Sequence, residues 1–285
     1  MARIIDLAAV LRDRLADGAA VPALTCYDFT TAQAVVGAAE AAGSPVVLLV
    51  APASAAGVPG LRFITALRTL ADAATVPVIV QLDHARDREL IRAAVSAGAS
   101  AVLADGSHLP EARNAAFVAA VVADVGHLVA VEAELGALPG DEDDATAAES
   151  SAPAGMTDPA RVARFLAASG ADLLAVSIGN VHGFYTGDPQ LDWKLLAALR
   201  TAAGDVPLVL HGASGIPETD LARAGTVGIG KVNINTELRT RTLADLADAL
   251  PAIREAGQNM LKLQGIWTGS VTLTTTWALK LLSGG

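Results

Sequence analysis

The sequence predicts a single-domain (β/α)8 TIM barrel, in which eight parallel strands close into a sheet inside a ring of helices. Short apolar segments alternate with segments of helical period along the chain, as expected when crossover helices connect parallel strands. Eight such units are present in 285 residues, and one barrel typically takes ~250. An open doubly wound sheet is the alternative, but eight regular units in this length favour closure.

The expected elements follow one another in order. The candidate strands are short and rich in Val, Leu and Ile, as in strands buried on both faces: Pro22–Tyr27, Val46–Val50, Val78–Leu82, Ala101–Ala104, Leu128–Glu134, Leu173–Ile178, Leu208–Leu210 and Gly228–Ile234. Helices fill the intervals, several beginning at Pro or ending before Gly: Thr30–Ala42, Leu61–Ala74, Asp87–Ala97, Pro110–Val125, Pro159–Ala168, Asp192–Ala203, Glu218–Ala224 and Thr236–Leu250.

Residues 1–285 are therefore expected to form one domain, with the barrel at about 21–250. A short amphipathic helix precedes the barrel. The tail is expected to be helical near Arg254–Leu263 and to continue into the Thr-rich stretch Thr268–Thr276, for which the sequence indicates no function.

Composition excludes several classes of function. Apolar runs are shorter than the ~20 residues that cross a bilayer, and the charged N-terminal segment is unlike a signal peptide. Cys26 is the only cysteine, so an intrachain disulfide and a thiolate zinc site are both excluded, and a cytoplasmic location is expected. The net charge of −10 disfavours nucleic acid and anionic membranes as partners.

Three histidines each follow a candidate strand: His84, His182 and His211. Residues at the carboxyl ends of barrel strands converge over the barrel axis. Three imidazoles with a fourth position open form the ligand set of a catalytic zinc. His108 and His127 lack this placement and are expected to be a turn residue and a surface residue.

Carboxylates accompany these histidines. Asp83 precedes His84 and is expected either to move a proton on bound substrate or to orient a histidine ligand. Glu132 and Glu134 share one strand face because side chains two apart point the same way. Buried carboxylates need a partner, so an ion, an arginine or a metal is expected near them.

Two loops have the features of a phosphate site. Gly212, Ser214 and Gly215 follow the seventh strand, while Asn233, Asn235 and Thr236 follow the eighth and open a helix. Glycine amides, hydroxyls and a helix start bind anions, and barrels often hold phosphate between these two loops.

The acidic, Gly- and Pro-containing interval Gly136–Thr157 is expected to be an active-site flap or a solvated excursion.

Six motifs, in order, resemble the class II fructose-bisphosphate and tagatose-bisphosphate aldolases over about Val21–Leu250. They are Leu82-Asp83-His84, Asp105–Pro110, Val131–Gly136, Gly179–Tyr185, His211–Gly215 and Lys231–Thr236.

The resemblance implies a zinc ion held by His84, His182 and His211, and a second divalent ion near Asp105 and Glu134. It implies that Asp83 exchanges a proton with the C4 hydroxyl and that Glu142 removes a proton from dihydroxyacetone phosphate. Gly183, Gly212, Ser214, Asn235 and Thr236 match phosphate-binding positions, and Asn233 matches a ketose-binding one. Carbonyls near Val181, Gly183 and Gly212 match a site for Na⁺ or K⁺. A cytoplasmic homodimer or homotetramer is also implied.

Several positions depart from the family pattern. Thr25 and Gln81 replace a usual asparagine and a usual histidine, and Pro139 sits in a normally Gly-rich loop. Thr186 replaces a lysine that often approaches the phosphate. Arg254 is a loose candidate for an arginine offered to a neighbouring subunit. These departures affect phosphate recognition and leave the three histidines intact.

The predicted activity is metal-dependent cleavage or formation of the C3–C4 bond of fructose or tagatose 1,6-bisphosphate, giving dihydroxyacetone phosphate and glyceraldehyde 3-phosphate. The alternatives are an aldolase for another ketose 1-phosphate, a Schiff-base aldolase using Lys231, and a degenerate barrel that binds sugar phosphate without turnover.

Overall fold

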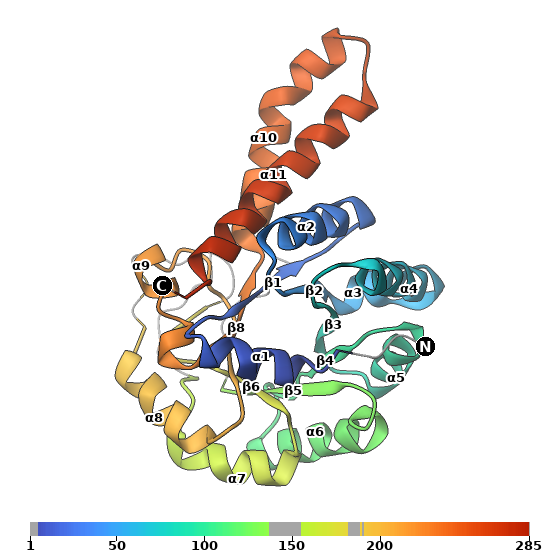
Figure 1. The fold of residues 1–285 in the computed structure, drawn as a ribbon. Coiled ribbons are helices and arrows are strands. Elements are labelled where there is room, and N and C mark those ends of the chain that lie inside the picture. Colours follow the sequence, from blue (N-terminus) through green and yellow to red (C-terminus); the bar gives the residue numbers. More distant parts are fainter. Residues whose placement is uncertain (1–4, 137–154, 182–188, 190, 285) are drawn as a thin grey trace.

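Eight parallel strands form a closed barrel, which confirms the predicted fold class. The computed structural model describes residues 5–136, 155–181, 189 and 191–284. Each strand pairs with the next along the chain and β8 pairs with β1 (Figure 1). The strands are β1 (Val21–Thr25), β2 (Val46–Val50), β3 (Val78–Ala85), β4 (Ala101–Ala104), β5 (Ala130–Leu135), β6 (Leu173–Val176), β7 (Leu208–Leu210) and β8 (Ile229–Ile234).

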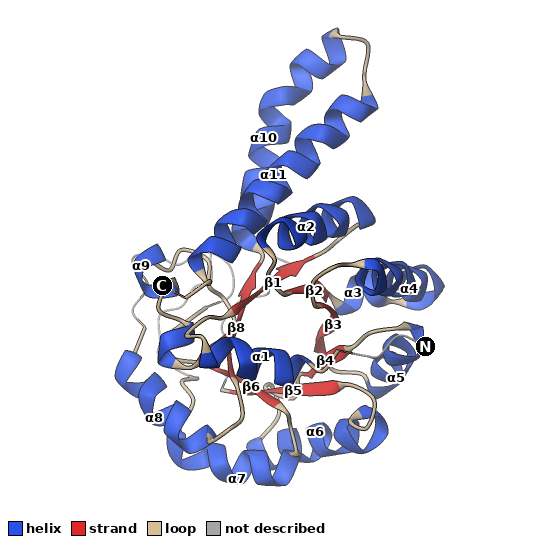
Figure 2. Ribbon diagram, in the orientation of Figure 1, coloured by secondary structure: helices blue, strands red, loops and turns tan. Residues whose placement is uncertain are grey.

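Helices surround this barrel, as Figure 2 shows by the blue ring outside the red strands. None of the helices in the described ranges is long and apolar enough to cross a membrane. The helices are α1 (Leu7–Ala16), α2 (Phe29–Ala42), α3 (Pro52–Ala55), α4 (Gly57–Ala73), α5 (Arg88–Ala97), α6 (Glu111–Val125), α7 (Pro159–Ser169), α8 (Trp193–Ala203), α9 (Glu218–Leu221), the 3-10 turn η1 (Gly225–Val227), α10 (Thr236–Glu255) and α11 (Met260–Leu281).

Two hydrophobic cores hold the barrel together. The larger core lies between the outer faces of the strands and the surrounding helices. The smaller core fills the barrel interior, where Val47, Leu49 and Ile79 pack with Leu7 and Leu11 of α1. Helix α1 therefore closes the amino-terminal end of the barrel, so that the opposite end, where the strands finish, is the open mouth.

The C-terminal tail differs from its prediction. The tail is helical as expected, but a turn at 256–259 interrupts the helix expected near Arg254–Leu263, and the two ends of this range belong to α10 and α11. The Thr-rich stretch lies within α11, where the buried Thr275 hydroxyl donates to the Val271 carbonyl at 2.8 Å. Helices α10 and α11 form a hairpin that projects beyond the ring of barrel helices (Figure 1).

Candidate metal centre and active site

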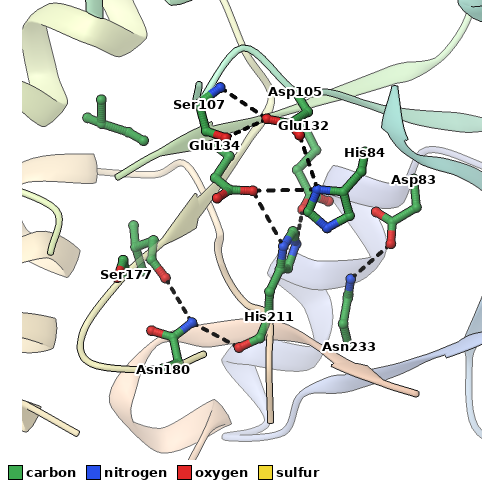
Figure 3. A network of polar contacts seen from close by, with 12 residues as sticks. Asp83, His84, Asp105, Ser107, Glu132, Glu134, Ser177, Asn180, His211 and Asn233 are labelled. Atoms are coloured by element: carbon green, nitrogen blue, oxygen red, sulfur yellow. Dashed lines mark hydrogen bonds and ion pairs between the residues drawn. The ribbon is translucent and has the colours of Figure 1, made fainter. Parts of the chain in front are cut away.

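Polar side chains from five strand ends meet at the mouth of the barrel (Figure 3). Asp83 and His84 come from β3, Glu132 and Glu134 from β5, and Asn233 from β8. Asp105 and His211 directly follow β4 and β7. Asp105, Glu132, Glu134, Asn233 and His211 are all buried.

A backbone irregularity in β3 brings two consecutive residues into this site. The pairing of β3 with β4 shifts register between Leu82 and Ala85. His84 has a φ of 42°, in the left-handed region that a non-glycine residue adopts at a cost. Consecutive side chains of a regular strand would point to opposite faces. With the irregularity, Asp83, His84 and His211 each place a potential ligand atom within 4.8 Å of the other two.

The two described histidines lie edge to face. Their ring centroids are 4.9 Å apart at an interplanar angle of 74°. The Oε2 atom of Glu134 lies 3.7 Å from Nδ1 of His84 and 3.7 Å from Nδ1 of His211. Ligand atoms around a tetrahedral zinc at ~2.1 Å are separated by about 3.4 Å. The spacing of these three atoms is therefore close to that of a metal site.

Glu132 fixes the tautomer of His211. Burial alone would raise the pKa of Glu132, but the Lys231 ammonium and the His211 hydrogen bond outweigh burial and lower the pKa to about 2. The carboxylate is then an acceptor only. Because His211 Nε2 lies 2.9 Å from Glu132 Oε1, Nε2 carries the proton, and in the neutral ring Nδ1 keeps the lone pair. A carboxylate behind a histidine in this way is the usual support of a metal ligand.

Glu132 is itself held by Lys231 and Gln81. Lys231 Nζ lies 2.6 Å from Glu132 Oε2 and donates to Gln81 Oε1 at 2.8 Å. Gln81 Nε2 donates to Glu132 Oε2 at 2.8 Å. All three side chains are fully buried. The partner that the sequence required for Glu132 is thus a lysine and a histidine.

Asp105 and Glu134 have opposite protonation behaviour. Burial would raise the pKa of Asp105, but hydrogen bonds from His84 and Ser107 outweigh burial and hold the pKa well below its usual range. Burial raises the pKa of Glu134 to about 7, opposed by the charges of His84 and His211 and assisted by those of Asp105 and Glu132. The four carboxylates around two histidines form a site that positive charge would stabilise.

This constellation fits a bound divalent cation. Two groups of residues offer ligand atoms that lie within 4.8 Å of one another: Asp83 with His84 and His211, and His84 with Asp105 and Glu134. Glu134 Oε2 and Asn233 Oδ1 are buried and accept no hydrogen bond from the described residues. Imidazole and carboxylate donors suit zinc and related divalent metals.

The expected phosphate loops are described in part. The Ser214 hydroxyl donates to Glu237 Oε2 at 2.7 Å, and the Gly215 N–H donates to Glu237 Oε1 at 3.1 Å. The Asn235 amide lies against the Tyr27 hydroxyl, with atoms 3.1 and 3.2 Å from it. The Glu237 carboxylate, in the first turn of α10, therefore already accepts from two donors of this loop. A bound phosphate would have to share these donors with Glu237 or displace its carboxylate.

Asn233 links this side of the mouth to the metal group. Its Nδ2 donates to Asp83 Oδ2 at 3.3 Å. Gly212 has a φ of 59°, in the left-handed region where a side chain would be strained, which explains a glycine directly after His211. Thr236 is buried at the start of α10.

Some predicted site residues lie outside the described residues: His182, Glu142, Gly183 and Thr186. Their predicted roles stay predictions, as does the monovalent-cation site that includes Gly183. His108 and His127 are exposed, as expected for residues outside the site.

The structure also brings in residues to which the sequence assigned no role. Asn180 Nδ2 donates to the His211 carbonyl at 2.9 Å, which holds the end of β7 against the loop after β6. Asn114 Nδ2 donates to the Glu134 carbonyl at 2.8 Å. Arg86 Nη2 lies 3.1 Å from Asp105 Oδ2. Only Asn180 had a sequence signal, since it lies in the Gly179–Tyr185 motif.

Comparison with known proteins agrees with this geometry. The family model described as fructose-bisphosphate aldolase class-II matches residues 5–273. The YdjI aldolase of Escherichia coli K12 is 31% identical, with a TM-score of 0.85 over 98% of this chain and 97% of that one. A putative fructose-1,6-bisphosphate aldolase from Coccidioides immitis is 27% identical, with a TM-score of 0.86 over 97% and 96%. The fructose-bisphosphate aldolase of Campylobacter jejuni, 21% identical, shares the fold with a TM-score of 0.79 over 99% and 97%.

A (β/α)8 barrel with histidines and carboxylates gathered at its mouth is typical of a barrel enzyme, here with residues suited to a metal. The chain belongs to the class II fructose-bisphosphate aldolase family. Membership implies aldolase chemistry on a phosphorylated sugar, with a metal ion as is general in this family.

Proposed function

We propose that this protein is a zinc-dependent aldolase that cleaves or forms the C3–C4 bond of a ketose 1,6-bisphosphate. Fructose 1,6-bisphosphate is the first candidate substrate, slightly ahead of tagatose 1,6-bisphosphate. The products are dihydroxyacetone phosphate and glyceraldehyde 3-phosphate. The observation that carries the proposal is the convergence of Asp83, His84 and His211 within 4.8 Å at the barrel mouth.

In this proposal His84 and His211, with His182, hold the metal. A bound metal supplies Lewis acidity that stabilises negative charge on the carbonyl side of the substrate. Glu132 keeps the proton on Nε2 of His211 and so directs Nδ1 toward the metal, supported by the distance of 2.9 Å between Nε2 and Oε1.

Asp83 is the proposed proton acceptor in cleavage. Its carboxylate takes the proton of the C4 hydroxyl, the C3–C4 bond breaks, and C4 becomes the aldehyde carbon of glyceraldehyde 3-phosphate. The electron pair of the broken bond stays with C3, which is then protonated to give dihydroxyacetone phosphate. The hydrogen bond from Asn233 Nδ2 to Asp83 Oδ2 orients the carboxylate for this role.

A Schiff-base mechanism is disfavoured by the environment of Lys231. A catalytic amine must be uncharged and must reach the substrate carbonyl. Lys231 is fully buried, and its Nζ lies 2.6 Å from the Glu132 carboxylate. Its Nζ is held by the Glu132 carboxylate and by Gln81 Oε1, so it is not placed to attack a substrate carbonyl. The proposal is therefore metal-dependent chemistry, with Lys231 as a structural cation.

The test is a cleavage assay over a panel of phosphorylated ketoses, with and without a chelator. We expect turnover of at least one ketose bisphosphate, loss of turnover on chelation, and recovery on adding zinc. Full activity in chelator, together with borohydride trapping of substrate on the protein, would instead identify a Schiff-base enzyme. Binding of the panel without turnover would identify a non-catalytic barrel.

A further inference from the structure

Asp105 is the most heavily hydrogen-bonded carboxylate in the second group of candidate metal ligands, His84, Asp105 and Glu134. Its Oδ1 accepts from the Ser107 N–H at 3.0 Å and from the Ser107 hydroxyl at 2.6 Å. Figure 3 shows the Asp105 carboxylate between Ser107 and His84. One oxygen of Asp105 is thus already used by its own loop.

The other oxygen faces the side chains of Arg86 and His84. Arg86 Nε and Nη2 donate to Asp105 Oδ2 at 3.2 and 3.1 Å. His84 Nδ1 lies 3.4 Å from the same oxygen. The Asp105 side chain is 1% exposed, whereas the Arg86 side chain is 61% exposed. An arginine from the barrel rim therefore reaches down to a buried carboxylate.

We propose that the Arg86 guanidinium replaces a second divalent cation at Asp105, so that each chain binds one metal ion and not two. This inference rests on the proposed metal-dependent function.

A second divalent ion and the Arg86 guanidinium would compete for the same oxygen of Asp105. A guanidinium stays protonated at any working pH, and two of its N–H groups converge on Asp105 Oδ2. A divalent ion coordinated by this oxygen would lie close to a fixed positive charge and would have to displace its hydrogen bonds. The first ion does not depend on this oxygen, because its proposed ligand His211 is supported by Glu132 and not by Asp105.

The test measures metal stoichiometry of the purified, chelator-stripped protein by equilibrium dialysis against zinc and elemental analysis. We expect one zinc per wild-type chain. Arg86→Met keeps the side-chain length and removes the charge, so we expect two zinc ions per chain, with the second bound at least tenfold more tightly than any weak binding in the wild type. Arg86→Lys should stay at one.

Two controls isolate the Asp105 contact. Arg88→Met removes the same charge from a nearby arginine whose guanidinium pairs with Asp124 on α6, so it should leave one zinc per chain. Adding Asp105→Asn to Arg86→Met should remove the second ion and keep the first. Because Arg86 and Arg88 are exposed, Arg86→Lys and Arg88→Met should melt within a few degrees of the wild type in metal-free buffer.

The outcomes separate this inference from the proposed function. Two ions per wild-type chain, or one ion in Arg86→Met, would overturn the role of Arg86 and leave a metal-dependent aldolase intact. No bound zinc in the wild type would overturn both.

Discussion

At the scale of single residues, the buried ion pair of Lys231 and Glu132 gives a prediction about stability. Lys231→Met leaves the Glu132 carboxylate buried without its cation, and breaking a buried pair from one side costs about 3–5 kcal/mol. We therefore expect the free energy of unfolding of the metal-free protein to fall by that amount in urea denaturation.

The control for this prediction changes both partners. Glu132→Gln with Lys231→Met removes both charges and keeps an acceptor for His211, so stability should return to within about 1–2 kcal/mol of the wild type. If the single and double variants were equally destabilised, the cost would come from packing and not from the uncompensated charge.

Asp83 gives a prediction about one chemical step. Asp83→Ala removes the proton acceptor for the C4 oxygen, so cleavage should fall by roughly 10²–10⁴-fold. Exchange of the C3 proton of dihydroxyacetone phosphate, assigned to Glu142, should be partly spared. Isotope exchange and cleavage measured on the same preparation make the comparison, and equal losses in both assays would contradict separate roles.

The histidines give a prediction about metal content. His211→Ala should abolish activity and lower bound zinc in a chelator-competition assay, because it removes a proposed ligand. It also removes the ring N–H that donates to Glu132. His127→Ala, at an exposed histidine far from the mouth, is the matched control and should bind zinc as the wild type does. Unchanged zinc binding in His211→Ala would refute the ligand assignment.

Residue types at strand ends could be predicted from the sequence, whereas their contacts could not. Alternation of apolar and polar segments placed His84 and His211 at the barrel mouth. The left-handed backbone at His84 was not predictable, because it arises from long-range pairing of β3 with β4. The contact between Gln81 and Lys231 joins residues 150 positions apart, and no local pattern encodes it.

At the scale of elements, the loop after β7 and the start of α10 act together through Glu237. Ser214 and Gly215 donate to this carboxylate. We expect Ser214→Ala to raise the KM for a ketose bisphosphate by about tenfold, since it loses a hydrogen bond to a charged phosphate. Zinc content should not change. Ser96→Ala, at an exposed serine of α5, is the control for both measurements. An unchanged KM would place the phosphate elsewhere.

Element boundaries were predicted well inside the barrel and poorly in the tail. Because proline usually ends a helix, the sequence predicts that this helix ends at Leu250. In the structure α10 continues through Pro251 to Glu255. Pro251 and Ala247, four residues earlier, are both exposed, so water can satisfy the carbonyl that lacks an N–H partner. Thr-rich segments have low intrinsic helix propensity, whereas in α11 buried packing outweighs that preference.

At the scale of the whole molecule, the projecting hairpin bears on oligomeric state. Helix α11 carries only Lys262 and Lys280 as charged residues, and Met260 and Leu261 at its start are 68% and 79% exposed. Such an exposed, largely apolar helix end is typical of a protein interface. We propose that it contacts a second copy of the chain in a homodimer or homotetramer.

Leu261→Glu places a charge on this surface and should shift the protein toward monomer in sedimentation velocity. The matched control is Leu128→Glu, at another exposed leucine on the far side of the barrel. A wild-type protein that sediments as a monomer at micromolar concentration would contradict the proposal.

Helix α1 has a consequence for the order in which the chain folds. Leu7 and Leu11 belong to the interior that the strands enclose, and α1 contacts β8, so the first helix made has its binding site completed by the last strand made. At about 5–20 residues per second of synthesis, these leucines wait on the order of ten seconds or more after leaving the ribosome. Contacts of such long sequence separation form slowly. Closure of the amino-terminal end of the barrel is therefore a late event that follows the synthesis of β8, and until then Leu7 and Leu11 lack part of the surface against which they pack.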